Sequence, residues 1–306
     1  MKDLILVTGS EGMIGSRFIE LYPEKNEVHT PRQIDFDITD KNQVKALIAS
    51  YEFKAVVHFA AFTDVDEAEK QRGKKELSCW QVNVEGTKNL IEAMEPRKDK
   101  IHFIHISTDM VFSGLAEDPG PYSENHPAEA KLENLSWYGY TKSEAERVVK
   151  NKLDGRATIL RLIYPVRAKF EGKLDFLRNP LTLYDEGKLY PLYSDQQISI
   201  SFVDEACKAI EKMIKDNKTG VFHASSGDTT TPLEIISYML EKTRKVKDVI
   251  AGITLEEYLK QSGDSPLRYP KYGGLSIKVT EQKLGMKFSS WHQIVDKLIS
   301  QGLGQD

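Results

Sequence analysis

Cysteine is scarce in this sequence, and so are long apolar runs and an excess of positive charge. Among the 306 residues only Cys79 and Cys207 are cysteines, without the spacing of a disulfide framework or a zinc site, so we interpret both as core thiols and predict no metal site. No apolar run approaches the ~20 residues of a membrane-spanning helix. The net charge of −4 gives no overall basic signal for binding to nucleic acid or an anionic membrane, which leaves only a local basic patch for such binding.

The amino-terminal residues lack the apolar stretch of a signal peptide. Met1-Lys2-Asp3-Leu4 leads directly into a short apolar strand and a glycine-rich loop. We therefore expect a cytoplasmic protein. With 40% hydrophobic and 29% charged residues, the chain has the balance of an ordinary globular protein, and its length suits one large or two medium domains.

A glycine-rich loop follows the first apolar run. Leu4–Val7 has the pattern of a buried strand, Thr8–Gly15 reads T-G-S-E-G-M-I-G, and apolar residues then recur at helical spacing. Glycine in such a turn admits a positive φ and lets the backbone approach a phosphate, while the start of the helix offers N–H groups and a positive dipole end. The loop therefore predicts a dinucleotide site, and a turn without a ligand is the alternative.

The residues after the second expected strand, 27–30, bear on the choice of cofactor. An NAD-preferring site often carries an acidic residue here to hold the ribose 2′-hydroxyl, whereas this chain offers Thr-Pro-Arg at 30–32. Arg32 is suited to a 2′-phosphate, so we expect NADP(H) as the preferred cofactor and NAD(H) as a second option. A solvated loop arginine is the other interpretation. Asp37 and Ile38 are expected to flank the adenine ring.

Alternating strands and helices predict the fold. Further apolar strands are expected at 55–61, 101–106 and 157–164, separated by helices over 41–51, 80–94 and 138–151. This alternation specifies an α/β fold with a doubly wound parallel sheet of the Rossmann kind. Later in the chain, helices are expected over 175–184, 201–215, 232–243, 253–261, 280–285 and 291–299, and a strand over 221–224. We predict a dinucleotide-binding domain over 1–165 and a smaller α/β substrate lobe over 166–306, some of whose segments return to the sheet.

Three residues near the end of one expected strand and the start of one expected helix predict the chemistry. Tyr138 and Lys142 lie at i and i+4 on one face of the helix, and Thr108 follows the strand at the edge where open α/β sheets bind ligands. A phenol beside an ammonium group, facing a threonine hydroxyl, is suited to donating a proton to a carbonyl oxygen. The Y-x-x-x-K pattern also begins at Tyr184 and Tyr238, but only Tyr138 opens a helix within the sheet half.

These motifs resemble those of the extended short-chain dehydrogenase/reductase superfamily. The resemblance rests on T-G-x-x-G-x-x-G at 8–15, A-A at 60–61, S-T-D at 107–109 and Y-x-x-x-K at 138–142. Within the superfamily the chain is most similar to the dTDP-4-dehydrorhamnose reductases, strongly over residues 4–165 and weakly thereafter. Further matching stretches are D-I-T-D at 37–40, F-T-D-V-D at 62–66 and V-N-V-E-G-T at 82–87.

The resemblance implies an oxidoreductase of nucleotide-sugar biosynthesis that transfers a hydride to C4 of a 4-keto-6-deoxy sugar nucleotide. Tyr138 then donates the proton to the C4 oxygen, Lys142 binds the nicotinamide ribose and lowers the pKa of the phenol, and Thr108 hydrogen-bonds the reacting oxygen. The residues implied to line the cofactor are Gly9, Glu11, Gly12, Met13, Ile14, Gly15, Arg32, Asp37, Ile38, Phe59, Ala60, Ala61, Thr63, Asn83, Tyr138 and Lys142. The residues implied to contact the substrate are Val65, Thr108, Asp109, Met110, Tyr138 and Tyr164. The expected partners are this substrate and, as an option, a second copy of the chain in a homodimer.

Three departures from the family pattern bear on the sugar more than on the chemistry. Met110 stands where the family usually has tyrosine, Tyr164 replaces a tryptophan of the substrate wall, and Ile198–Ser201 replaces the usual glycine and Pro-Thr. Because Met110 cannot carry a proton, a 4,6-dehydratase, which needs a carboxylate there, is disfavoured. Two alternatives stay open. One is a sugar-nucleotide 4-epimerase with the same Tyr/Lys pair and tightly held NAD, and the other is a non-catalytic regulatory subunit that keeps the fold and the dinucleotide.

Overall fold

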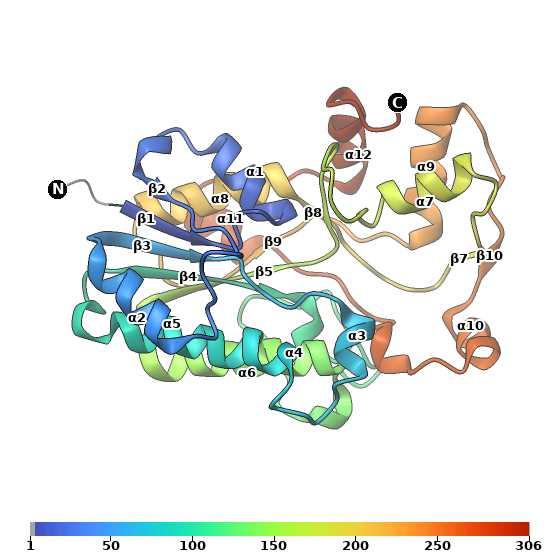
Figure 1. Cartoon of the computed structure of the whole chain (residues 1–306). Coiled ribbons are helices and arrows are strands. Elements are labelled where there is room, and N and C mark those ends of the chain that lie inside the picture. The colour runs from blue at the N-terminus through green and yellow to red at the C-terminus, as the bar shows by residue number, and fades with distance from the viewer. Residues whose placement is uncertain (1–3, 306) are drawn as a thin grey trace. The chain divides into compact units, whose positions relative to one another are not determined.

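The computed structural model describes residues 4–305, in which strands and helices alternate along the chain (Figure 1). The strands are β1 (Leu4–Thr8), β2 (Val28–His29), β3 (Phe53–His58), β4 (His102–Thr108), β5 (Ala157–Leu162), β6 (Pro165–Val166), β7 (Leu192–Tyr193), β8 (Ser201–Phe202), β9 (Gly220–Ala224) and β10 (Gly252–Ile253). The helices are α1 (Met13–Leu21), α2 (Lys41–Ser50), α3 (Val65–Glu69), α4 (Ser78–Trp80), the π-helix η2 (Gln81–Gly86), α5 (Thr87–Met94), α6 (Trp137–Leu153), α7 (Arg178–Asp185), α8 (Val203–Lys215), α9 (Pro232–Arg244), α10 (Leu255–Ser262), α11 (Lys278–Leu284) and α12 (Trp291–Ser300). Short 3₁₀ turns lie at η1 (Lys25–Glu27), η3 (Glu95–Arg97), η4 (Asp109–Val111), η5 (Leu132–Asn134) and η6 (Pro266–Arg268).

The chain divides into two compact units. Unit 1 is formed by Met1–Phe112, Pro127–Arg161 and Cys207–Phe222, as far as these residues are described. Unit 2 is formed by Ser113–His126, Leu162–Ala206 and His223–Asp306, within the same limit. The division predicted from the sequence, a cofactor domain up to residue 165 and a substrate lobe beyond it, stays a prediction.

Six strands form one sheet in the order β2-β1-β3-β4-β5-β9. β1 pairs in parallel with both β2 and β3, and β3 pairs in parallel with β4. The strand order therefore reverses between β1 and β3, and doubly wound sheets bind ligands beyond the carboxyl ends of the strands at such a point. The predicted α/β fold with a doubly wound parallel sheet is confirmed.

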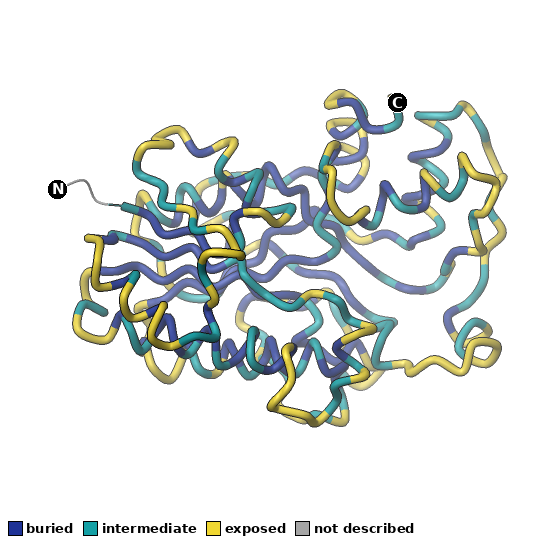
Figure 2. The backbone as a smooth tube through the Cα atoms, viewed as in Figure 1, coloured by how far each residue is buried: buried dark blue, intermediate teal, exposed yellow. Residues whose placement is uncertain are grey.

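The sheet of unit 1 is buried because helices cover both of its faces. Helices α2, α5 and α6 lie along one face and α1 along the other (Figure 1). The central strands are buried along their length (Figure 2), which explains why their sequences read as unbroken apolar runs rather than as alternating ones. Each fully buried Leu, Ile or Phe side chain stabilises the fold by about 1.5–3 kcal/mol. Members of this core include Leu6, Val44, Ile48, Val56, Leu90, Ile91, Phe103, Val149 and Ile159.

The helix predicted over residues 80–94 is broken into three parts. A π-helix, η2, lies between α4 and α5 and contains Asn83. The buried Asn83 amide accepts a hydrogen bond from the Phe62 backbone N–H at 2.8 Å and donates to Thr141 Oγ1 at 2.9 Å. A π-turn inserts one residue into a helix and often marks a functional position, and here it directs Asn83 towards the segment after β3.

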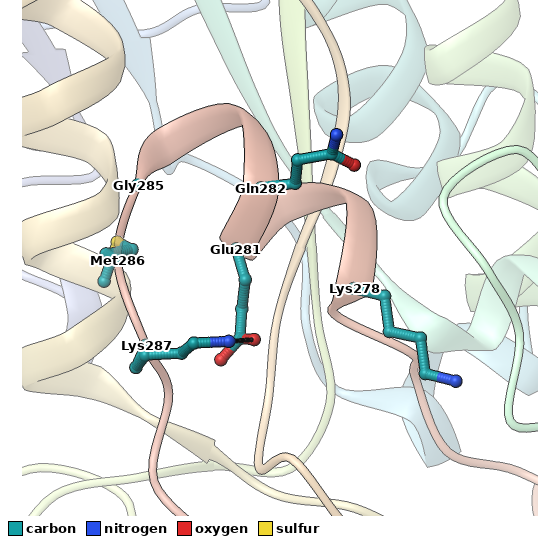
Figure 3. A pocket seen from close by; sticks show the side chains of 6 residues that line it. All are labelled: Lys278, Glu281, Gln282, Gly285, Met286 and Lys287. Atoms are coloured by element: carbon teal, nitrogen blue, oxygen red, sulfur yellow. Dashed lines mark hydrogen bonds and ion pairs between the residues drawn. The ribbon is translucent and has the colours of Figure 1, made fainter.

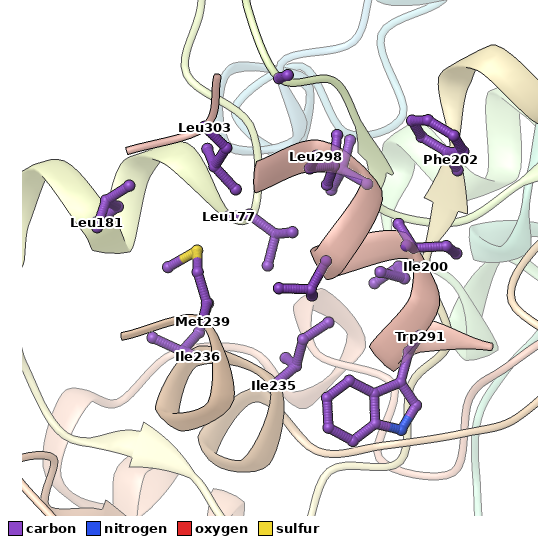
Figure 4. Packing of buried hydrophobic residues seen from close by; sticks show 14 of the residues in the cluster. Leu177, Leu181, Ile200, Phe202, Ile235, Ile236, Met239, Trp291, Leu298 and Leu303 are labelled. Carbon is purple, nitrogen blue, oxygen red and sulfur yellow. The ribbon is translucent and has the colours of Figure 1, made fainter. Parts of the chain in front are cut away.

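Unit 2 has its own core, built where α7, α9 and α12 pack together (Figure 4). Two pairs of very short parallel strands, β6 with β8 and β7 with β10, accompany it. The buried side chains that form this core include Leu177, Leu181, Ile235, Ile236, Met239, Trp291 and Leu298. Across the described part of both units, no helix combines the length and the apolar character needed to cross a bilayer.

The turn after β1 depends on glycine, and this can be tested with a matched pair. Gly9 and Gly73 both have a positive φ, +68° and +79°, which costs another residue roughly 1–2 kcal/mol. A Cβ on Gly9 would also lie 2.6 Å from the Ala60 nitrogen, whereas a Cβ on Gly73 would meet nothing within 4 Å. We therefore expect Gly73→Ala to lower the free energy of unfolding by about 1–2 kcal/mol, and Gly9→Ala to lower it by at least ~3 kcal/mol. Equal losses in chemical denaturation would contradict the close packing at Gly9.

Candidate functional site

The glycine loop forms a tight cradle between β1 and α1. Gly12 occupies the N-cap position of α1, and its N–H donates to the Gly9 carbonyl at 3.1 Å. A Cβ on Gly15 would lie 2.3 Å from the Gly9 oxygen, so only glycine lets the helix start this close to the turn. No acidic side chain stands in the first turn of α1. Gly9, Gly12, Met13, Ile14 and Gly15 thus present a backbone surface and a positive helix end suited to a pyrophosphate.

The segment after β2 is tied to the glycine loop. Ser10 Oγ donates to the Pro31 carbonyl at 3.4 Å, and Glu11 accepts a hydrogen bond from the Gln33 N–H at 2.9 Å. Arg32 is 65% exposed and its Nε lies 2.7 Å from Asp35 Oδ2. A 2′-phosphate that binds Arg32 would therefore compete with the Asp35 carboxylate for the guanidinium group.

The side chains of Asp37 and Ile38 are held by different contacts within the protein. Asp37 Oδ1 accepts hydrogen bonds from both the N–H and the hydroxyl of Thr39 at 2.8 Å, which forms a local turn. The Ile38 side chain is buried, and a Cβ on Gly86 would lie 2.7 Å from its Cδ1. The apolar part of Ile38 thus belongs to the core, and its contact with an adenine ring stays a prediction.

The segment after β3 runs beside the glycine cradle. The Phe59 ring packs on Phe18 of α1, with 5.8 Å between the ring centroids, and the Ala60 backbone is the part that approaches Gly9. Asn83 bonds both backbone groups of Phe62 and so fixes the path of this segment. The remaining predicted residues here are Ala61 and Val65, which are half-buried, and Thr63, which is exposed.

The structure brings the three predicted catalytic side chains together at the end of β4. Thr108 is the last residue of β4, and Tyr138 and Lys142 lie in the first turns of α6. The Thr108 side chain lies close enough to the phenol of Tyr138 to lower the phenol's pKa, against the effect of burial. Thr108 Oγ1 also donates to Asp109 Oδ1 at 3.0 Å, and Lys142 Nζ donates to the Ile106 carbonyl at 2.8 Å.

Gly139, which was not predicted as a site residue from the sequence, allows α6 to approach the end of β4 this closely. A Cβ on Gly139 would lie 2.2 Å from the Met110 carbonyl oxygen, so α6 touches the backbone of η4 at this point. The Ser136 side chain caps the helix by accepting from the Gly139 N–H at 3.2 Å. The signal in the sequence was a glycine inside a helix between two tyrosines, where propensity alone would disfavour it.

Burial shifts the pKa values of the side chains in this site in the direction that favours their neutral forms. It raises the pKa of Tyr138, and the nearby Asp109 carboxylate raises it further. It also raises the pKa of Asp109 to about 7 and lowers the pKa of Lys142 to about 8. Burial sets the net direction of the shift in the phenol's pKa, and the expectation that Lys142 lowers this pKa stays a prediction.

The last two substrate residues predicted from the sequence lie in different units. Met110 belongs to η4 in unit 1, next to Asp109. Tyr164 belongs to unit 2, where it has a φ of +38° and packs on Phe176 with 4.5 Å between the ring centroids. It is therefore not among the side chains that unit 1 brings together.

A surface pocket of unit 2 has a different character from this site. It lies along α11 and the residues that follow (Figure 3). Glu281 pairs there with Lys287 at 2.5 Å, and the pocket contains none of the predicted site residues. Among residues 4–305 no three His, Cys, Asp or Glu side chains are grouped as ligands for a metal ion.

The raised pKa of Asp109 predicts how stability depends on pH. The folded protein binds the Asp109 proton more tightly than the unfolded chain, whose value is about 3.9. Between about pH 4 and pH 7 stability should therefore fall as the pH rises. We expect Asp109→Asn to be more stable than the wild type above pH 7, by up to about 4 kcal/mol, and the difference to shrink towards pH 4. Urea unfolding at several pH values measures this, and parallel curves for both proteins would contradict it.

A probable dTDP-4,6-dihydroxy-2-methyloxan-3-one 4-ketoreductase of Streptomyces antibioticus is 34% identical over 230 residues, which is 74% of this chain and 72% of that protein. A dTDP-4-dehydrorhamnose reductase of Aggregatibacter actinomycetemcomitans is 25% identical over 307 residues, 96% of this chain and 97% of that protein. The crystal structure of the dTDP-4-dehydrorhamnose reductase of Bacillus anthracis, in complex with NADP, shares the fold, with a TM-score of 0.81 and 23% identity over 98% of this chain and 99% of that one.

The match to a family extends over almost the whole chain. A family model described as the RmlD substrate binding domain matches residues 1–303. This confirms the resemblance inferred from the glycine loop and the Tyr-x-x-x-Lys pair. The chain belongs to the RmlD substrate binding domain family, within the extended short-chain dehydrogenases/reductases.

Proposed function

We propose that the protein reduces the C4 ketone of a 4-keto-6-deoxy sugar nucleotide with NADPH. The observation that carries the proposal is the meeting of Thr108, Tyr138 and Lys142 at the end of β4, in the unit that also holds the glycine cradle. Relatives that are named as reductases of dTDP-linked keto sugars support this substrate class. We expect the enzyme to work in the cytoplasm.

The cradle fits a dinucleotide. The steric limits at Gly9 and Gly15 leave a backbone surface that a side chain would otherwise fill, and the N-terminus of α1 favours a negative charge there. The pyrophosphate would rest on Gly9–Gly15, with Ala60, Ala61, Thr63 and Asn83 beside it, and Lys142 would hold the nicotinamide ribose. NADPH, when bound, supplies the hydride that C4 accepts.

The proton reaches the C4 oxygen from Tyr138. Its raised pKa keeps the phenol protonated at neutral pH, so the proton is present when the ketone arrives. The Thr108 hydroxyl, which lies near the phenol, orients the same oxygen. After transfer the phenolate stands one helical turn from the Lys142 ammonium, whose positive charge stabilises it. Val65, Asp109 and Met110 are the residues of unit 1 that we propose to shape the sugar site.

Loss of the phenol tests the role of Tyr138. We expect Tyr138→Phe to lower kcat by about 10²–10⁴-fold, since it removes the general acid and keeps the ring. The measurement is NADPH oxidation with a 4-keto-6-deoxy sugar nucleotide. Tyr140→Phe is the matched control, because Tyr140 lies on the same helix and stacks on Trp137, and its kcat should stay near that of the wild type.

The outcome of this assay also separates the alternative functions. Turnover that survives Tyr138→Phe would remove the proposed mechanism. Interconversion of two 4-hydroxy sugar nucleotides without consumption of NADPH would favour the 4-epimerase. An absence of turnover with every sugar nucleotide, together with binding of the dinucleotide, would favour the regulatory subunit.

Arg32 tests the choice of cofactor. We propose that it binds the 2′-phosphate of NADPH after leaving Asp35. A hydrogen bond to a charged group is typically worth ~1.5–3 kcal/mol, so Arg32→Ala should raise the KM for NADPH roughly 10- to 150-fold and leave the KM for NADH nearly unchanged. Asp35→Asn should lower the KM for NADPH, because it frees the guanidinium group.

A matched surface pair controls for general charge effects. Arg147 is 62% exposed and pairs with Glu144 three residues earlier on α6, much as Arg32 pairs with Asp35. Arg147→Ala should change neither KM. Equal changes for NADH and NADPH in Arg32→Ala would show that Arg32 does not read the 2′-phosphate.

A further inference from the structure

A fully buried ion pair lies directly behind the proposed catalytic residues. Glu146 on α6 and Arg161 on β5 are both 0% exposed. Arg161 donates to the two oxygens of Glu146 at 2.8 and 2.7 Å, and its guanidinium group also stands 4.7 Å from the Phe112 ring centre. The proposed mechanism uses neither residue. A buried pair of this kind is weak evidence for stability by itself, because desolvation costs about as much as the attraction returns.

The same carboxylate reaches β4 beside Thr108. Ser107 Oγ donates to Glu146 Oε1 at 2.8 Å. Three consecutive residues of β4 thus each meet one of three residues spaced four apart along one face of α6. The Ile106 carbonyl receives Lys142, the Ser107 hydroxyl meets Glu146, and the Thr108 side chain meets Tyr138. The register between strand and helix therefore sets where all three catalytic side chains lie.

We propose that Glu146 is a positioning residue, which locks α6 to the end of β4 through Ser107 and supports the positive charge of Lys142. The inference rests on the proposed function. Glu146 touches neither the cofactor site nor the reacting atoms, and it acts through Ser107 and Lys142.

The charges around Lys142 explain why a carboxylate is needed behind it. Burial lowers the pKa of Lys142, and Glu146 opposes that shift. Besides Tyr138, whose raised pKa keeps it neutral, the titratable groups near Lys142 are Cys79 on α4, His58 on β3 and His105 on β4. Burial raises the pKa of the thiol and lowers those of both imidazoles, so all three are neutral at pH 7. Glu146 stays ionised, since Arg161, Lys150 and Ser107 more than offset its burial and lower its pKa.

The test compares Glu146 with a second buried carboxylate of similar surroundings. Glu205 in unit 2 accepts hydrogen bonds from Ser289 Oγ at 2.6 Å and from Lys297 Nζ at 2.8 Å, and it is 7% exposed. Glu146→Gln and Glu205→Gln should both lower the melting temperature. Only Glu146→Gln should lower kcat of the folded enzyme, by about tenfold or more. It should also move the alkaline limb of the kcat–pH profile to lower pH by about one unit, because Lys142 then loses its proton more easily.

A purely structural role would leave the pH profile in place. If folded Glu146→Gln keeps the wild-type kcat and alkaline limb, or if both variants lose activity only in proportion to the unfolded fraction, the proposal is overturned. Ser107→Ala and Ser107→Thr decide the case if Glu146→Gln does not fold. Alanine should lower kcat and threonine, which keeps the hydroxyl, should retain most of it, whereas equal activities would overturn the link to β4.

A readout without turnover keeps this inference distinct from the proposed function. The pKa of Lys142 can be measured by NMR titration of labelled lysine side chains, with Lys142→Met to assign the signal. A lower pKa in Glu146→Gln than in the wild type supports the inference even if no sugar nucleotide is reduced, in which case the proposed function alone fails. An unchanged pKa overturns the electrostatic part of the inference.

Discussion

The packing of α6 against the end of β4 is the contact on which the site depends. Three side chains with complementary chemistry come from two elements separated by about thirty positions in the chain, and only a fixed register between these elements can hold them together. Gly139 lets the helix approach the Met110 carbonyl, and the Ser136 cap sets where the helix begins. The sheet contributes the rigid end of β4, which is buried along its length.

Burial and charge oppose each other around these side chains. Desolvation favours the neutral forms of Tyr138, Asp109 and Lys142, and it does the same for the histidines at 58 and 105. A protonated phenol suits the donation of a proton, while a neutral lysine would not stabilise the phenolate that remains. We therefore propose that Glu146, which Arg161 keeps ionised, has a place in the chemistry as well as in the core, since its negative charge favours a charged Lys142.

The fold was largely predictable because its strongest signals are local. Apolar runs became β1, β3, β4 and β5, and the expected helices over 41–51, 138–151 and 232–243 match α2, α6 and α9 to within two residues. The π-helix was missed because an inserted residue does not disturb the apolar spacing enough to be read, and the two-residue strands of unit 2 are too short to show a period.

The site was predictable only in part. Sequence motifs predicted Thr108, Tyr138 and Lys142 as catalytic residues, since the i, i+4 spacing of Tyr138 and Lys142 on one helix face can be seen in the sequence. The contacts of Glu146 with Ser107 and Arg161 could not be predicted from the sequence. They join a helix to two strands and depend on which side chains face one another in the folded core. For the same reason the sequence could not show how strongly burial and Asp109 raise the pKa of the Tyr138 phenol.

A crystal structure of the protein with NADP⁺ and a 4-keto-6-deoxy sugar nucleotide would test the central claim most directly. We expect the C4 oxygen to lie within about 2.6–3.2 Å of both Tyr138 Oη and Thr108 Oγ1, with Lys142 Nζ on the nicotinamide ribose and the β4–α6 contacts unchanged. A ketone bound away from Tyr138, or a Tyr138 ring turned out of the site in that complex, would contradict it.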